Sequence, residues 1–175
     1  MVAYFLTALC ALVLDQLLKL WTVENIALGQ QLDFIPGVLG LTYFRNTGMA
    51  FSLLSEHTWI LAVLSVVSIP VLGWLLTKKK WFTRWERFAI ALVMGGAAGN
   101  AVDRVFRGYV VDMLEPLFVN FAVFNIADAC INVGAILFCL LYIIRAFRDD
   151  GRKHSVDSET GERIEDDGNG GDRRH

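Results

Sequence analysis

The stretch WILAVLSVVSIPVLGWLLT, from Trp59 to Thr77, contains no charged residue. A helix needs about 20 mostly apolar residues to cross the hydrocarbon of a bilayer, so this stretch predicts a transmembrane helix. Three further stretches, at 3–21, 88–104 and 126–144, are apolar over a similar length. The sequence therefore predicts a membrane α-helical fold with four transmembrane helices.

The composition agrees with the membrane class. Hydrophobic residues make up 55% of the chain and the mean hydropathy is +0.47, whereas soluble domains are about 45–50% apolar. Residues 148–175 hold nine of the eighteen acidic residues and are rich in glycine. We expect residues 1–147 to form one membrane domain and 148–175 to form a polar, disordered tail. No basic patch indicates binding to nucleic acid.

Basic residues set the expected orientation in the membrane. Residues 78–80 are three lysines between the second and third predicted helices, and Arg145 begins a second basic group after the fourth. By the positive-inside rule both regions lie in the cytoplasm. An even number of helices then places both termini in the cytoplasm, and the loops at about 22–58 and 104–125 lie outside.

The first outer loop, about 22–58, has a pattern of its own. Residues 31–34 and 39–44 partly alternate between polar and apolar types, which is typical of strands. Between them, Pro36-Gly37 predicts a turn. We therefore expect a small β element in this loop, lying on the membrane surface.

Ionisable residues of the predicted helices gather on one side of the membrane, because the first and third helices run outward and the fourth runs inward. Charged groups in membrane segments are costly, and they mark functional sites. We therefore expect a polar pocket at the outer interface. The residues concerned are Asp15, Lys19, Asp103, Arg104, Asp112 and Asp128.

Asp112 and Asp128 are the candidate catalytic pair. Two carboxylates that face each other over one water can share a proton, because like charges a few ångströms apart resist double ionisation. One carboxylate can then take a proton from the water while the other gives a proton to a substrate carbonyl. The spacing alone leaves open that both residues merely cap a helix or line an interface.

Other residues of this region have structural explanations as well. Asp15 and Lys19 stand four residues apart with the acid first, which suits an ion pair along a helix as well as a substrate contact. Arg104 could anchor the third helix at the interface. Gly95 and Gly99 form a GxxxG pattern, which is typical of closely packed membrane helices.

Other functional classes are less well supported by the sequence. It has no HExxH motif and no Cys/His spacing that would indicate a metal site. Only His57 shares the outer face with a cysteine, Cys130, so a cysteine protease would rest on one pair. A proton-coupled transporter is an alternative, although transporters hold their acids near the bilayer midplane. A four-helix scaffold protein would need no polar layer.

Five motifs, in order along the chain, resemble those of the bacterial lipoprotein signal peptidases, the signal peptidase II family. DQLLK, NTGMAFS, GGAAGNAVDR, VVD and FNIAD are similar to the family's DQxxK, NxGxAFS, GGAxGNxxDR, VVDF and FNxAD blocks. One departure is Met113, which stands where the VVDF block has phenylalanine. The motifs begin at Asp15, Asn46, Gly95, Val110 and Phe124.

The resemblance implies an intramembrane aspartic endopeptidase with no metal or other cofactor, in which Asp112 and Asp128 are catalytic. Its substrates would be prolipoproteins with a diacylglyceryl cysteine, cut on the amino side of that cysteine. The site would lie at the outer face of the bacterial inner (cytoplasmic) membrane, in contact with lipid, and would bind globomycin-type inhibitors. The residues that would bind substrate or brace the pocket are Asp15, Lys19, Asn46, Gly48, Asn100, Arg104 and Asn125.

Overall fold

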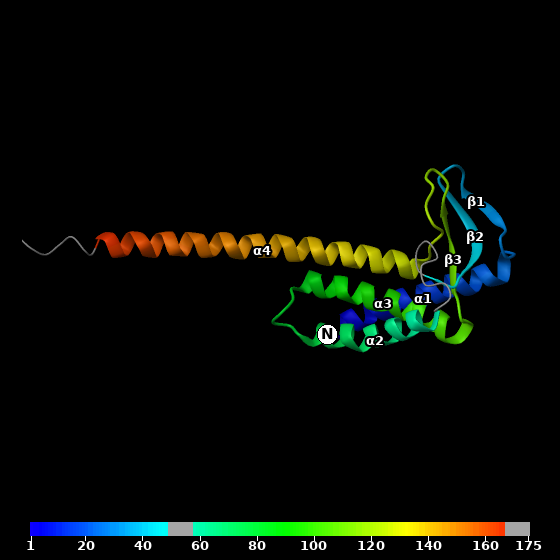
Figure 1. Ribbon diagram of the computed structural model, residues 1–175, viewed down its shortest axis with the longest axis horizontal. Coiled ribbons are helices and arrows are strands. Elements are labelled where there is room, and N and C mark those ends of the chain that lie inside the picture. The colour runs from blue at the N-terminus through cyan, green and yellow to red at the C-terminus, as the bar shows by residue number, and fades with distance from the viewer. Residues whose placement is uncertain (49–57, 167–175) are drawn as a thin grey trace, which may run out of the picture. The chain divides into compact units, whose positions relative to one another are not determined.

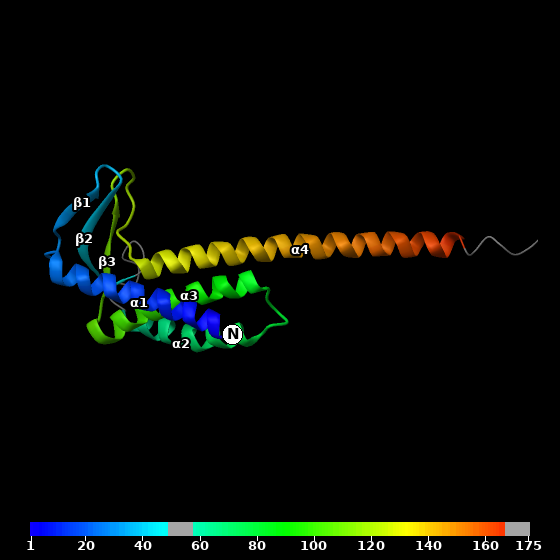
Figure 2. The same ribbon diagram turned by 180° about the vertical axis from the view of Figure 1, so that it is seen from behind.

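The computed structural model describes residues 1–48 and 58–166. The chain divides into two compact units, Met1–Phe138 and Cys139–His175. In the first unit the helices run side by side, and a sheet stands at the end opposite the N-terminus (Figures 1 and 2). The elements in chain order are α1 (Val2–Asn25), β1 (Gln31–Ile35), β2 (Leu39–Asn46), α2 (Thr58–Thr77), α3 (Arg84–Arg107), β3 (Val110–Pro116) and α4 (Ile126–Asp166).

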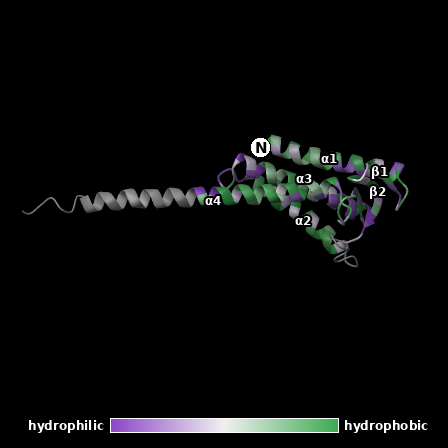
Figure 3. Ribbon diagram, turned by 90° about the horizontal axis from the view of Figure 1, so that it is seen from above, coloured by the Kyte–Doolittle hydropathy of each residue, from purple (hydrophilic) through white to green (hydrophobic). Residues whose placement is uncertain are grey.

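Among the described residues, four helices are long and apolar enough to cross a membrane. Their spanning parts are Val2–Asn25, Trp59–Thr77, Arg84–Arg107 and Ile126–Arg148. Hydrophobic residues dominate these helices, and hydrophilic residues gather around the sheet (Figure 3). The predicted fold class is confirmed, and the chain is a multi-pass membrane protein.

α3 begins and ends at local signals in the sequence. The Thr83 hydroxyl accepts a hydrogen bond from the Glu86 N–H (3.3 Å), and the Glu86 carboxylate accepts one from the Thr83 N–H (2.7 Å). This reciprocal capping box satisfies donors that the first turn leaves without partners. At the other end Gly108 has a φ of 76°, a left-handed conformation that suits glycine. The chain then passes directly into β3, which carries Asp112.

Glycines of α3 bring α1 and α4 into close contact with it. A Cβ atom on Gly95 would lie 2.5 Å from the Ala8 carbonyl oxygen of α1. A Cβ atom on Gly96 would collide with the Ala127 carbonyl oxygen of α4. Small residues let membrane helices approach until their backbones touch. The predicted packing role of this glycine run is therefore confirmed.

Gly96→Ala is expected to lower the thermal stability of the protein in detergent. The added methyl group meets the α4 backbone, and overpacking of this kind costs about 1–3 kcal/mol. Gly73→Ala is the matched control, because a Cβ atom there would meet only the Met94 sulfur at 3.8 Å. Thermal unfolding of both variants tests the contact, and equal melting temperatures would contradict it.

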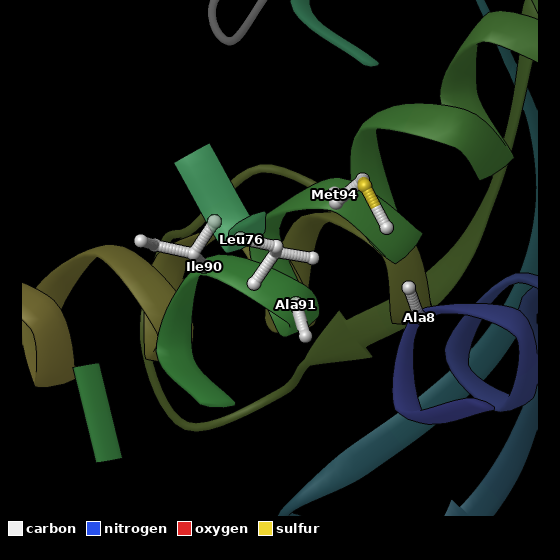
Figure 4. Close-up of a cluster of buried hydrophobic side chains, with 5 residues drawn as sticks. All are labelled: Ala8, Leu76, Ile90, Ala91 and Met94. Carbon is white, nitrogen blue, oxygen red and sulfur yellow. The ribbon is translucent and has the colours of Figure 1, made fainter. Parts of the chain in front are cut away.

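Apolar contacts hold α1, α2 and α3 together towards the end away from the sheet. The buried cluster there consists of Ala8, Leu76, Ile90, Ala91 and Met94 (Figure 4). Leu76 and Ala91 are fully buried. Two of the five side chains are alanines, so the helices approach closely at this cluster. Polar side chains of these helices gather instead at the end near the sheet.

The sheet is antiparallel with the order β1-β2-β3. β1 and β2 form the predicted hairpin around Pro36-Gly37, so the small β element is confirmed. The third strand was not predicted from the sequence. It pairs with the free edge of β2 and places Asp112 opposite Phe44. Val111 and Met113 point to the other face, where they pack with Ile26 of α1's end.

α4 continues to Asp166 in the structure, through residues for which the sequence predicted a disordered tail. No proline follows Pro116 in the chain, so no residue after it lacks the backbone N–H that a continuing helix needs. The segment is polar, as expected. The division at 147/148 and the disorder of 148–175 stay predictions.

Candidate active site

Two aspartates from different elements face one cavity. Asp112 lies in β3 and Asp128 lies in the first turn of α4. Both line a cavity of about 500 Å³, whose wall also contains apolar side chains of α2, β2 and α4. The other polar residues in this wall, together with one glycine, are Asn46, Gly48, Ser65, Asn100, Arg104 and Asn132.

Asn125 joins the two aspartates. Its side-chain Nδ2 donates to Asp112 Oδ1 (2.6 Å), and its backbone N–H donates to Asp128 Oδ2 (3.3 Å). Its own Oδ1 accepts from the Asp128 N–H (2.9 Å). Asn125 and Asp128 thus form a capping box at the start of α4, as the structural alternative anticipated. Asn125 also donates to Asp112, so one residue both caps α4 and links the two aspartates.

Two further asparagines donate to the aspartates. Asn46 Nδ2 donates to Asp112 Oδ2 (2.8 Å), and Asn100 Nδ2 donates to Asp128 Oδ1 (2.7 Å). A second hydrogen bond, donated to the amide oxygen, orients each of these side chains. The Gly48 N–H donates to Asn46 Oδ1 (2.9 Å), and Lys19 Nζ donates to Asn100 Oδ1 (3.0 Å). Every oxygen of the two carboxylates therefore accepts an N–H from a fixed direction.

Asp112 is a carboxyl group whose pKa is raised well above its ordinary value. Burial, the largest cause, raises its pKa from the ordinary 3.8 to about 7. The negative charge of Asp128 raises this pKa further, whereas the hydrogen bonds from Asn46 and Asn125 act against the rise. A buried carboxyl beside a second carboxylate is the arrangement in which one proton serves two acids.

A buried ion cluster lies behind the cavity wall. Lys19 Nζ contacts Asp15 Oδ2 at 2.8 Å, Asp103 Oδ2 at 2.9 Å and Asn100 Oδ1 at 3.0 Å. An ammonium group has three N–H donors, and these three oxygens use all of them. The side chains of Lys19, Asp15 and Asp103 are completely buried. Lys19 therefore joins α1 to α3 and orients the amide that holds Asp128.

Both acids of this cluster also bind backbone of other elements. Asp15 Oδ1 accepts from the Ala127 N–H (2.9 Å), so a carboxylate of α1 sits at the start of α4. Carboxylates at helix N-termini are stabilising. Asp103 Oδ2 accepts from the Val111 N–H (3.1 Å), and Asp103 also pairs with Arg107. These contacts position both elements that carry the aspartates.

Arg104 brings a positive charge to the cavity. Its Nη2 donates to the Gly48 carbonyl (3.3 Å), and its Nε is buried with no hydrogen-bond partner in the described part of the chain. A guanidinium has five N–H donors, and the described residues leave several of them for a bound molecule.

The structure divides the predicted site residues into two groups. Asn46, Gly48, Asn100 and Arg104 line the cavity together with the two aspartates. Asp15, Lys19 and Asn125 are fully buried outside this lining. Direct contact of these three with substrate stays a prediction, and the contacts above assign them a supporting position.

Residues 49–52 of the second motif, and His57, lie outside the described residues. In the part that the structure describes, no group of three metal-ligating side chains occurs.

Three polar residues near the site were not predicted from the sequence. Gln16 Nε2 donates to the Gly99 carbonyl (3.1 Å) and thereby ties α1 to the glycine run of α3. Its place inside the DQLLK motif could have indicated this. Ser65 and Asn132 line the cavity from α2 and α4. Each is one polar residue in an apolar helix, and only the fold shows which side it faces.

The fold is that of a bacterial membrane enzyme. One solved structure of a bacterial membrane enzyme, at 2.3 Å resolution, matches with a TM-score of 0.77 and 29% identity, covering 87% of this chain and 92% of that one. A second, at 1.9 Å resolution, matches with a TM-score of 0.74 and 28% identity, covering 81% of this chain and 93% of that one.

The family follows from the sequence comparisons. The family model described as signal peptidase (SPase) II matches residues 7–144. A lipoprotein signal peptidase of Streptococcus pyogenes serotype M5 (strain Manfredo) is 40% identical over 134 residues, which cover 77% of this chain and 88% of that protein. The corresponding protein of serotype M18 (strain MGAS8232) gives the same values. The chain belongs to the signal peptidase II family and is a peptidase.

Proposed function

We propose that this chain is an aspartic endopeptidase that removes signal peptides from diacylglyceryl-modified prolipoproteins, cutting on the amino side of the lipidated cysteine. Asp112 and Asp128 are the catalytic residues. The observation that carries the proposal is that both carboxyl groups line one cavity and are bound by the same residue, Asn125. The names of the relatives supply the substrate class.

The first step adds water to the scissile carbonyl. In the working form Asp112 carries the proton of the pair, which its raised pKa of about 7 favours. Asp128 takes a proton from the attacking water, and Asp112 gives its proton to the carbonyl oxygen. The product is a neutral tetrahedral diol, so no charged intermediate forms in the low-dielectric cavity.

The second step breaks the carbon–nitrogen bond. Asp128 gives its proton to the departing nitrogen while Asp112 takes a proton back from one hydroxyl of the diol. The two products are a carboxylic acid and an amine, and the pair returns to its starting state with one proton. The three asparagines that donate hydrogen bonds to Asp112 and Asp128 keep both carboxyl groups in place during the two steps.

The remaining cavity residues bind the substrate. Arg104 lies beside the aspartates, and its Nε has no partner among residues 1–48 and 58–166, so its guanidinium suits peptide carbonyl oxygens next to the scissile bond. The apolar wall, with Leu61 and Leu64 of α2, suits the apolar part of a signal peptide and the acyl chains of the lipidated cysteine. Lipid molecules and globomycin-type cyclic peptides would compete for this same cavity.

The test of this function is cleavage of a synthetic precursor by the purified protein in detergent. We expect two products, and mass spectrometry should place the new amino terminus at the diacylglyceryl cysteine. Cleavage should persist in excess EDTA, because both proton transfers use carboxyl groups of the chain. Intact precursor after long incubation, or activity that EDTA removes and zinc restores, would refute the aspartic mechanism.

The plot of cleavage rate against pH is expected to be bell-shaped. Asp112 has a raised pKa of about 7, so the pair loses its working proton as the pH rises through about 7. At low pH the pair gains a second proton and can no longer take one from water. The two apparent pKa values belong to the pair. Measuring kcat/KM against pH tests this, and a rate that stays flat from pH 6 to 9 would contradict it.

We further propose that the site faces outward in the bacterial inner membrane, with both termini in the cytoplasm. The basic residues Lys78–Lys80 and Arg145 support this orientation. A reporter fused after residue 82 or 150 is expected to read cytoplasmic, and one within 106–110 should read external. An external signal at residue 82 would reverse the orientation.

A further inference from the structure

The part of the cavity wall formed by the membrane helices contains two polar side chains that the reaction does not use. Ser65 comes from α2 and Asn132 from α4, and their neighbours in the wall include Leu61, Leu64 and Ile131. Both lie in segments that cross the membrane. A polar group there is costly unless it has a hydrogen-bond partner, so each requires an explanation.

Ser65 satisfies part of its hydrogen-bonding capacity locally. Its hydroxyl donates to the Leu61 carbonyl one turn earlier in α2 (2.8 Å). This bond uses its only hydrogen and leaves the oxygen lone pairs as acceptors towards the cavity.

For Asn132, the described residues provide no comparable hydrogen bond within its own helix. Its side chain is exposed, and no hydrogen bond of its amide is found to any residue that the structure describes. Its amide offers two donors and one acceptor oxygen. An unsatisfied amide in a membrane segment costs free energy, and a bound molecule with both a donor and an acceptor would remove that cost.

The position of Asn132 indicates which molecule this is. It follows Asp128 by four residues, which is about one turn or 6 Å along α4. An extended peptide rises about 3.3 Å per residue, so 6 Å corresponds to about two residues. From Asp128, α4 runs into the membrane, where the apolar part of a signal peptide lies. A substrate held at the aspartates therefore places main chain on the amino side of the scissile bond beside Asn132.

An extended substrate needs such a partner. When a signal peptide unwinds at the site, its backbone N–H and C=O groups lose their helical partners inside an apolar region. The amide of Asn132 can accept from one N–H and donate to one C=O of the same strand, and Ser65 on the opposite helix can accept from a second N–H.

We propose that Asn132 is a substrate-binding residue that pairs with the precursor main chain about two residues on the amino side of the scissile bond, and that Ser65 is an accessory acceptor. This assignment rests on the proposed function. The enzyme would then bind the main chain of the substrate whatever side chains the signal peptide carries.

Steady-state kinetics of Asn132→Leu is the first test. Leucine keeps the size of the side chain and removes both hydrogen bonds. We expect kcat/KM to fall by roughly tenfold, mainly through KM, with an unchanged melting temperature. Val133→Leu is the matched control, because Val133 is an exposed neighbour on α4 that does not line the cavity. Equal kcat/KM in wild type and Asn132→Leu would overturn the proposal.

Precursors with one backbone ester identify the pairing directly. An ester at a non-scissile position removes one N–H donor and weakens the neighbouring acceptor. For the wild type, we expect one ester within the three residues before the scissile bond to lower kcat/KM several-fold. For Asn132→Leu, the same ester should add no further loss. An equal ester effect in both proteins at every position would overturn the pairing, whereas failure of the wild type to cleave the all-amide precursor would refute the proposed function itself.

Discussion

Replacing either Asp112 or Asp128 with asparagine is expected to lower the cleavage rate by at least about 10⁴-fold, a magnitude known for removal of catalytic groups. Asparagine keeps the shape of the side chain but cannot exchange a proton with water or substrate. Because the two acids work as one unit, the double variant should be no slower than either single variant. Single-turnover cleavage of a lipidated precursor measures all three.

Asp33→Asn is the matched control for these variants. Asp33 is an exposed residue of β1 that does not line the cavity, so its loss should leave the rate unchanged. Melting temperatures close to that of the wild type would show that the catalytic variants are folded. Substantial turnover by folded Asp112→Asn or Asp128→Asn would remove that residue from the mechanism.

Lys19→Met is expected to cause the largest loss of stability. It leaves the buried carboxylates of Asp15 and Asp103 without their shared cation. Breaking a buried ion pair on one side costs about 3–5 kcal/mol. Thermal unfolding in detergent should show this as a drop of roughly 10 °C. Cleavage should fall as well, because Asn100 loses the donor that orients it towards Asp128.

Two further variants separate charge from position. Lys79→Met removes an exposed lysine of the α2–α3 connection and should leave stability unchanged. Lys19→Met combined with Asp15→Asn leaves Asp103 with Arg107 as its partner, so part of the stability should return. Activity should not return, because the amide of Asn100 still lacks its donor. A Lys19→Met protein that melts like the wild type would contradict the stabilising role of the buried cluster.

The membrane helices could be predicted because one physical requirement dominates them. A segment such as Trp59–Thr77 must be apolar over the thickness of the bilayer, and this requirement is visible in the sequence. The strand that carries Asp112 was not predicted, because Val110–Pro116 does not alternate regularly between polar and apolar residues and its pairing partner lies in β2. A strand at a sheet edge depends on a distant neighbour, which a local pattern does not reveal.

In the site, too, contacts within one helix could be predicted from the sequence, whereas contacts between helices could not. The pairing of Asp15 with Lys19 follows from their spacing along one helix, and the structure contains it. The contact of Lys19 with Asn100 joins α1 to α3, so its distance could not be inferred from spacing. The position of Asn132 in the cavity wall likewise depends on how α4 packs against α3, which the glycines of α3 decide.

The hydrogen bond from the Ala127 N–H to Asp15 has a consequence for how the protein is made. Asp15 and Lys19 both lie on the first helix, so their ion pair needs no later part of the chain. Asp128 and the N–H that Asp15 accepts arrive only with the last helix. No partly synthesised chain can therefore hold both aspartates in place. We therefore expect proteolytic activity only after the last helix has been inserted.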